Sequence, residues 1–285
     1  MAADAAAGDP QSVPRVAELL VPVDLSHESW RVLPLARWIG DELSAAIVPL
    51  YVDASSPAAG SQTARPVVLR TSVAGTAVAV QVLPGADTAA VIEQRAQRGP
   101  GSVVVMSTHG HGSHPERAWG ELCDRLLMAD PAGILAVGPH FDADRNASVK
   151  RVAVCIDAAA PDHEIVQEAL AWADRLNVPL VVVTVKGHGR SRPGEDDTYH
   201  VIASVFEELP PARVSVTAEA LDDLDVAPAI CRFGERQAGT LLALAPGAAP
   251  RAVHSMTHSV TMAVARETRN AMLLRWHRGE SGDAT

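Results

Sequence analysis

Short apolar runs and amphipathic stretches alternate along the chain. An apolar run of roughly four to eight residues is typical of a buried strand, and apolar residues at every third or fourth position are typical of a helix that packs on a sheet. Residues 21–52 thus predict a strand, a helix that contains Trp38, and a second β-rich run. The rest of the first half predicts strands at residues 78–83, 101–106 and 134–137 and helices at residues 87–97, with Asp87 as N-cap, and at about 118–128.

The second half repeats this layout. Residues 154–185 match residues 21–52, because each segment opens with an apolar run that ends in Asp, at Asp24 or Asp157, and continues into a helical pattern. Further strands are predicted at residues 214–218, 240–244 and 271–276, and helices at residues 227–237 and about 257–269. Five strands alternating with four helices, twice over, predict an α/β fold with two doubly wound parallel sheets.

The repeat sets the expected domain organisation. A loose tail at residues 1–14 precedes a first domain at residues 15–139. A polar linker rich in turn formers at residues 140–150 leads to a second domain at residues 151–278, with a short tail at residues 279–285. A chain of 285 residues is long enough for two such domains, each with its own core.

Composition and charge narrow the partners. A formal net charge of −10 disfavours a nucleic acid or an anionic membrane as the main partner, because both need clustered Lys and Arg. No apolar stretch approaches the roughly 18 residues of a membrane span, and the acidic opening does not resemble a secretory signal, so we expect a cytoplasmic protein. The three cysteines, Cys123, Cys155 and Cys231, form no C-x-x-C pattern, and neither a disulfide framework nor a zinc site is expected.

A ligand site is expected at one end of each sheet. In an open parallel sheet, ligands bind beyond the carboxyl ends of the strands where the strand order reverses, so the informative loops follow the first and fourth strands. Asp24 and the segment after Met106 would share a cleft in the first domain, and Asp157 and the segment after Leu244 would share one in the second. The alternative for each Asp is a strand-end residue that caps the next helix.

The segments VPVD, SVVVMSTHG and AWGELCDRLLMADPAGILAV resemble the universal stress protein family, in two copies that cover essentially the whole chain. The resemblance implies two flavodoxin-like (adenine nucleotide alpha hydrolase-like) domains, each a five-stranded parallel sheet with helices on both faces. It also implies that the domains pair through their last strands, so that residues 134–137 and 271–276 meet in an intramolecular pseudo-dimer. A further homodimer is left open, and the protein partner is unknown.

In that family a loop of pattern G-x2-G-x9-G-[S/T] after the fourth strand binds the phosphates of ATP. In the first copy the glycine positions hold Ser107, Gly110 and Gly120, while Glu121 stands where a hydroxyl is expected. A carboxylate there replaces a hydrogen bond with like-charge repulsion, a change of about 1–3 kcal/mol against binding. Together with Asp24, these residues form the candidate ATP site. The alternative is that Glu121 interacts with the helix dipole and stabilises an empty loop.

The second copy departs further from the pattern. Ala245, Ala248 and His258 occupy the three glycine positions, and only Ser259 keeps the hydroxyl. Alanine is strained wherever the backbone needs a positive φ, and a histidine ring fills space meant for a ligand. Asp157 and Ser259 are therefore doubtful nucleotide contacts. We expect no resident cofactor, with ATP left open for the first domain only.

Other polar clusters do not complete a recognisable site. His109, His111 and His114 lie in a short polar run, but no Cys or carboxylate completes a metal-ligand set, and an exposed loop is expected there. Asp162 and His163 lack a nucleophile at a recognisable elbow. Residues 187–197 read as an exposed connection, with docking of a partner as the alternative.

These observations favour a non-enzymatic stress-response or regulatory protein that acts as an interaction scaffold. One alternative is an ATP-responsive switch that uses the first domain. The other is a small-molecule enzyme with an unrecognised site at the point where the strand order reverses.

Overall fold

The computed structural model describes residues 15–55, 65–70, 77–99, 101–110, 120–129, 133–158, 161–186, 197–246 and 260–275. The first half contains strands β1 (Glu18–Pro22), β2 (Ala46–Asp53), β3 (Arg65–Arg70), β4 (Ala77–Pro84), β5 (Ser102–Ser107) and β6 (Ile134–Val137), with the short helix η1 (Ser29–Val32) and helices α1 (Leu33–Leu43), α2 (Thr88–Arg98) and α3 (Glu121–Ala129). The second half contains strands β7 (Arg151–Cys155), β8 (Leu180–Lys186), β9 (Val216–Asp222), β10 (Thr240–Leu244) and β11 (Ala271–Leu274), with helices α4 (Ala143–Asn146), α5 (His163–Leu176), α6 (Asp197–Glu208), α7 (Val226–Arg236) and α8 (Val260–Glu267).

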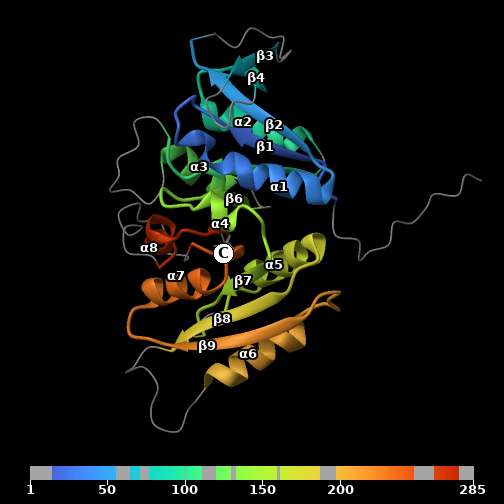
Figure 1. Ribbon diagram of the computed structural model, residues 1–285. Coiled ribbons are helices and arrows are strands. Elements are labelled where there is room, and N and C mark those ends of the chain that lie inside the picture. The colour runs from blue at the N-terminus through green and yellow to red at the C-terminus, as the bar shows by residue number, and fades with distance from the viewer. Residues whose placement is uncertain are drawn as a thin grey trace, which may run out of the picture.

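All the described strands join one sheet of 11 strands in the order β3-β4-β2-β1-β5-β6-β11-β10-β7-β8-β9 (Figure 1). Within each half the core strands run parallel. β1 lies between β2 and β5, and β7 lies between β8 and β10, so that in both halves the first predicted strand lies between the second and the fourth. This is a doubly wound arrangement, in which the strand order reverses between the first and fourth strands. The predicted α/β fold class is therefore confirmed.

The first half departs from the prediction at one edge. Where the alternation predicted a helix between the second and third strands, the chain forms β3, which pairs antiparallel with β4 from Arg65↔Val82 to Arg70↔Ala77. The described part of the first half therefore has six strands and not five. Among the described residues, the expected helix is seen in the second half, where α6 lies between β8 and β9.

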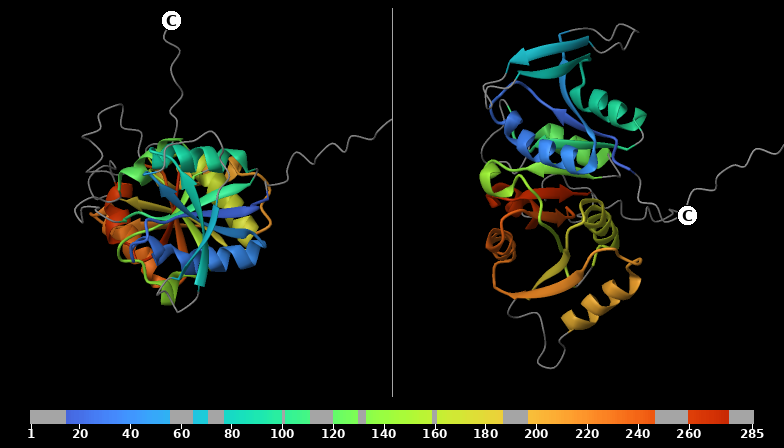
Figure 2. Two further views of the ribbon diagram at one scale, coloured as in Figure 1. Left: turned by 90° about the horizontal axis from the view of Figure 1, so that it is seen from above. Right: turned by 45° about the vertical axis from the view of Figure 1, so that its right-hand side comes forward.

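Helices cover both faces of the sheet (Figure 2). Buried side chains of α1, α5 and α6 belong to one apolar cluster, which includes Leu35, Trp172 and Val205. Those of α2, α3, α7 and α8 belong to a cluster on the opposite face, which includes Leu126 and Phe233. Each cluster contains residues from both halves of the chain, so the two halves share their core.

The two halves meet strand to strand. β6 pairs antiparallel with β11, from Ile134↔Leu274 to Val137↔Ala271, which is the contact between last strands that the resemblance implied. Gly138 follows β6 so close to α8 that an added Cβ would lie 2.5 Å from the carbonyl oxygen of Ala265. A side chain at position 138 would therefore push the two halves apart.

The linker is more closely packed than its polar composition suggests. It contains α4 and buries Phe141. The Asn146 side chain donates to the carbonyl oxygen of Arg269 at 2.8 Å and accepts from the amide of Gly239 at 3.0 Å and from Asn270 at 3.4 Å. These buried hydrogen bonds hold the linker against the second half.

Equivalent residues of the two halves make the same backbone contacts. Gly101 and Gly239 precede the fourth strands with φ values of +80° and +77°. The carbonyl oxygen of Gly101 accepts from the amide of Ala17 at 2.9 Å, and that of Gly239 accepts from the amide of Lys150 at 2.7 Å. These pairs fix a residue-by-residue correspondence between the halves, in which residue 18 matches residue 151 and residue 102 matches residue 240.

Candidate functional site

The structure brings two of the predicted site residues of the first half together. β1 and β5 lie side by side, and their ends deliver Asp24 and Gly110 to the same edge of the sheet. A Cβ added to Gly110 would lie 2.4 Å from Oδ2 of Asp24. A side chain at position 110 would therefore displace the Asp24 carboxylate from its place in the turn.

The Asp24 carboxylate organises its own turn. Oδ1 accepts a hydrogen bond from the Ser26 amide at 2.9 Å and from the Ser26 hydroxyl at 2.6 Å. Leu25, between them, has a positive φ of 67°, and its side chain is exposed. This local bonding is typical of an Asp that shapes a strand-to-helix turn.

The loop after β5 is closed by a backbone hydrogen bond. The amide of Gly120 donates to the carbonyl oxygen of Thr108 at 2.8 Å, across the start of α3. Among the described residues, the only heavy atom that an added Cβ at Gly120 would meet is the same carbonyl oxygen, at 3.8 Å. Within that part of the chain Gly120 has no close contact of the kind seen at Gly110, and its amide already has a partner within the protein.

Glu121 is the first residue of α3 and is exposed. A carboxylate in the first turn of a helix interacts favourably with the helix dipole. It also carries negative charge into the position where the family pattern expects a hydroxyl. The predicted helix at 118–128 thus begins later than expected, because Gly120 is not helical.

Three consecutive polar residues, Ser107, Thr108 and His109, lie buried at the end of β5. The Ser107 hydroxyl is buried, and among the described residues it has no hydrogen-bond partner. His109 is only 7% exposed, with Nδ1 2.8 Å from the Thr108 hydroxyl. The expectation of an exposed loop is therefore wrong for His109, whereas His111 and His114 lie outside the described residues. Burial follows from the position of His109 directly after a central strand.

The second half closes its loop differently. The hydroxyl of Thr261, in the first turn of α8, donates to the carbonyl oxygen of Ala245 at 2.8 Å. Asp157 follows β7 and is exposed, as Asp24 is after β1. The remaining predicted loop positions, Ala248, His258 and Ser259, lie outside the described residues.

The other sequence candidates have structural roles where they are described. Asp162 caps α5 by accepting from the amides of Glu164 and Ile165. His163 lies beside Glu208 of α6, with Nδ1 and Oε2 2.9 Å apart. Residues 187–196 of the expected loop lie outside the described residues.

The cysteines are poor nucleophiles. Burial raises the pKa of Cys123 far above its usual range and raises that of Cys155 to about 12. The pKa of Cys231 is also raised by burial to about 12. A thiol with such a pKa stays protonated at neutral pH, and it is the thiolate that attacks.

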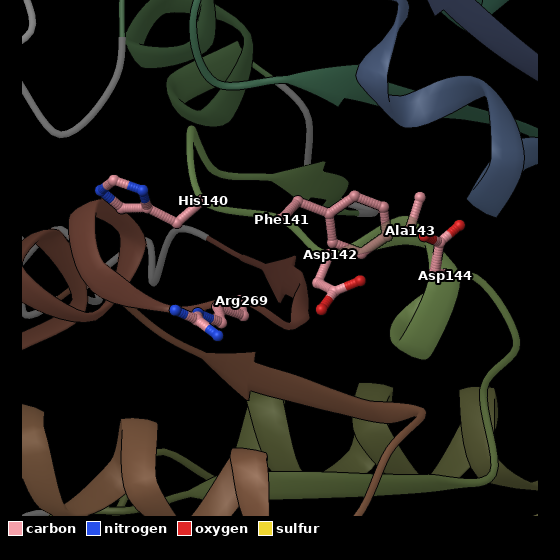
Figure 3. A pocket seen from close by; sticks show the side chains of 6 residues that line it. All are labelled: His140, Phe141, Asp142, Ala143, Asp144 and Arg269. Carbon is pink, nitrogen blue, oxygen red and sulfur yellow. The ribbon is translucent and has the colours of Figure 1, made fainter.

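One cavity of about 400 Å³ lies at the linker and away from the predicted clefts (Figure 3). Five of its lining residues belong to the linker, and Arg269 reaches in from the turn between α8 and β11. Its lining residues are His140, Phe141, Asp142, Ala143, Asp144 and Arg269. The sequence pattern gave no signal for it, because the two walls come together only when α8 docks on the linker.

Comparison with known proteins defines the class of fold. No family model matches the sequence, and no curated protein matches it. A candidate universal stress protein from Pseudomonas aeruginosa UCBPP-PA14 matches with a TM-score of 0.59 at 13% identity, over 93% of this chain and 94% of that one. A universal stress protein from Archaeoglobus fulgidus DSM 4304 matches with a TM-score of 0.57 at 13% identity, over 93% of this chain and 98% of that one.

A protein of unknown function from Pseudomonas aeruginosa PAO1 is similar to the same degree, with a TM-score of 0.56 at 12% identity over 93% of this chain and 94% of that one. The chain therefore has the fold of these universal stress protein structures. In the part of the chain that the structure describes, every helix is too short or too polar to span a membrane.

Proposed function

We propose that this chain is a stress-response or regulatory protein of the universal-stress-protein type that works as a cytoplasmic interaction scaffold and not as an enzyme. The proposal rests on the fold, which extends over nearly the whole chain, and on the state of the two loops that would hold ATP phosphates. At the described ends of these loops, the Gly120 amide and the Thr261 hydroxyl both donate to acceptors within the protein.

The hydrogen bond between the Gly120 amide and the Thr108 carbonyl carries the proposal. A phosphate-binding loop works by leaving backbone amides free at a helix N-terminus. Here the amide that precedes α3 is already bonded within the protein. An incoming phosphate would have to break that bond before it could gain one.

Charge acts in the same direction. Glu121 adds a carboxylate to the first turn of α3, and Asp124 adds a second in the same turn. Both favour the helix in the absence of ligand, because they complement its dipole, and both oppose an anion at the same place. In the second half, Thr261 donates to Ala245 and ties the end of β10 to α8.

An ATP-responsive switch in the first half is the second candidate. Asp24, Gly110 and the buried Ser107 hydroxyl all lie at the point where the strand order reverses. An unpartnered buried hydroxyl has a desolvation cost that a bound ligand could offset. This reading requires the Gly120 amide to exchange its partner on binding.

Calorimetric titration separates the two candidates. ATP with magnesium is titrated into the wild type, into Glu121→Ser, and into Glu207→Ser, in which an equally exposed glutamate of α6 is removed far from the loop. The scaffold proposal expects no heat of binding from the wild type or from Glu207→Ser, and weak binding at most from Glu121→Ser. Micromolar binding by the wild type would establish the switch instead.

A further inference from the structure

The sheet has two outer edges, and they differ. β3 forms one end of the sheet and β9 forms the other (Figure 1). In the first half the third strand of the fold, β4, is covered by the antiparallel strand β3. The equivalent strand in the second half, β9, has no strand beyond it among the described residues.

Two hydrogen bonds show which residues of β9 face outward. The amide of Leu180 donates to the carbonyl oxygen of Ser215 at 3.0 Å, and the amide of Asp223 donates to that of Lys186 at 3.4 Å. Odd-numbered residues along β9 therefore direct their backbone groups toward β8. Because this direction alternates along a strand, Val216, Ala218 and Ala220 direct their amides and carbonyls away from the sheet.

This outer edge is accessible and has few of the features that keep edge strands from pairing with another chain. Ala218 is exposed and Ala220 is partly exposed, and the neighbouring helix α6 packs against β8. β9 contains no proline, whereas β3 has Pro66, which lacks an amide hydrogen. Natural edge strands are usually interrupted by proline, bulges or charge, so β9 is the less protected end of the sheet.

The sequence of β9 is complementary to itself when two copies run antiparallel. With Ala218 opposite Ala218, two outward-facing residues exchange both backbone hydrogen bonds, and Val216 faces Ala220 on either side. Thr217 then faces Glu219, so no carboxylate faces another. The Glu219 side chain is also paired with Arg236 of α7, at 2.5 Å, which reduces its cost at a seam.

We propose that two copies of this chain associate through their β9 edges, antiparallel and centred on Ala218. The contact is isologous and closes a dimer, because the same edge is used by both partners. It places at the second half the kind of antiparallel cover that β3 supplies to β4 in the first half. The opposite edge, with Pro66, remains outside the contact.

The first test is the oligomeric state of the full chain, measured by light scattering on a sizing column over a range of concentrations. The wild type is expected to show twice the monomer mass at high concentration. Ala218→Pro removes one outward amide at the centre but no bond to β8, so it should fold and should weaken the dimer about tenfold or more. A wild type that is monomeric at the highest concentration reached, or a dimer unaffected by Ala218→Pro, overturns the proposal.

Cross-linking tests the register independently of the proline variant. In an antiparallel hydrogen-bonded pair, opposite Cα atoms lie about 5.5 Å apart, a separation that a disulfide can span. Ala218→Cys is therefore expected to form a covalent dimer on mild oxidation. Thr217→Cys is the matched control, because residue 217 faces Glu219 of the other copy and not the other residue 217. This variant should run as a monomer in electrophoresis without reducing agent.

Equal cross-linking of the two variants, or none by Ala218→Cys, counts against the contact. Of the native thiols, Cys123 and Cys231 are buried and Cys155 is partly exposed, so the wild type oxidised in parallel gives the background. Open-ended polymers in place of dimers would point to pairing between β9 and β3 and would also overturn the proposal. None of these outcomes depends on whether the protein binds ATP.

Discussion

The two halves stabilise the amino end of their first strand with different side-chain interactions. At the amino end of the first strand, Glu18 makes two hydrogen bonds to Arg95, at 2.6 and 2.7 Å, and accepts from Ser102. The equivalent position in the second half is Arg151, whose guanidinium lies 4.4 Å from the ring centroid of Phe233.

Ser102 in the first cluster and Thr240 in the second play the same part. Arg151 donates to the Thr240 hydroxyl at 2.9 Å, and Thr240 donates to the carbonyl oxygen of Gln237 as Ser102 does to that of Gly99. An ion pair in one half thus occupies the place of a cation–π contact in the other. The comparison teaches that the backbone frame defines this fold, while the side chains that fill it are exchangeable.

The largest loss of stability is expected from substitutions that disrupt the equivalent backbone contacts of the two halves. Gly101→Ala and Gly239→Ala each force a side chain into a positive φ, and the new Cβ would lie 2.2 Å from the Arg15 oxygen or 2.3 Å from the Ser148 oxygen. Each substitution should lower the free energy of unfolding by about 2–3 kcal/mol, measured by urea denaturation. Similar losses from both would show that the frame matters equally in the two halves.

Gly120→Ala is the control for this pair. Its Cβ meets the Thr108 oxygen at an ordinary 3.8 Å, so the change in stability should stay within about 0.5 kcal/mol. A loss at position 120 as large as that at position 101 would show that the close backbone contact at Gly101 is not what makes glycine necessary there.

An intermediate effect is expected at the exchanged clusters. Arg95→Ala leaves the partly buried Glu18 carboxylate without its main partner and should cost about 2 kcal/mol at neutral pH. The hydrogen bond from Arg95 lowers the pKa of Glu18 below its usual 4.5. The stabilisation is therefore present above pH 4.5 and is lost as the pH falls through the lowered folded-state pKa.

The acid range distinguishes the two clusters. The stability difference between wild type and Arg95→Ala should shrink as the pH falls below 4.5 and vanish below the lowered pKa of the folded wild type, where both proteins carry a protonated Glu18. Arg151→Ala is the matched change in the second half, and its cost should shrink less in that window, because the direct contacts of Arg151 are a ring, a hydroxyl and a carbonyl oxygen, and the Glu219 carboxylate acts on it only as a nearby charge. Parallel pH profiles for the two variants would refute the comparison.

The smallest effect is expected at the loops. Thr261 corresponds to Cys123 of the first half, and Thr261→Cys removes the hydroxyl that donates to Ala245. The expected loss is about 1 kcal/mol by urea denaturation. Thr261→Ser, which keeps the hydroxyl, should lose clearly less, and equal losses would show that the hydrogen bond contributes nothing.

Periodicity predicted the strands that lie deep in the sheet, because runs such as that of β5 must be apolar when both faces are covered. The prediction of Asp87 as an N-cap is confirmed by its hydrogen bond from the Ala90 amide. β3 was missed because the segment RPVVLR is short and begins with Arg and Pro, features that depend on an edge position which only the sheet order reveals.

The candidate site was less predictable. The pairing of Asp24 with Gly110 follows from the rule for parallel sheets, and the sequence placed both residues at the correct end. The burial of His109 and the closure of the Gly120 amide on Thr108 depend on how β5, β6 and α3 pack together. Residue types in the loop carry no record of those contacts.

The antiparallel seam of β6 with β11 also sets what variation the molecule tolerates. In an assembly of two identical chains, every substitution occurs on both sides of the symmetry axis at once. Here the two sides belong to one polypeptide, so Gly138, which follows β6, can fit against α8 while Arg275, which follows β11, pairs with Glu164 of α5. Because the halves are covalently joined, the twofold axis between them is only approximate. A substitution on one side of it need not occur on the other.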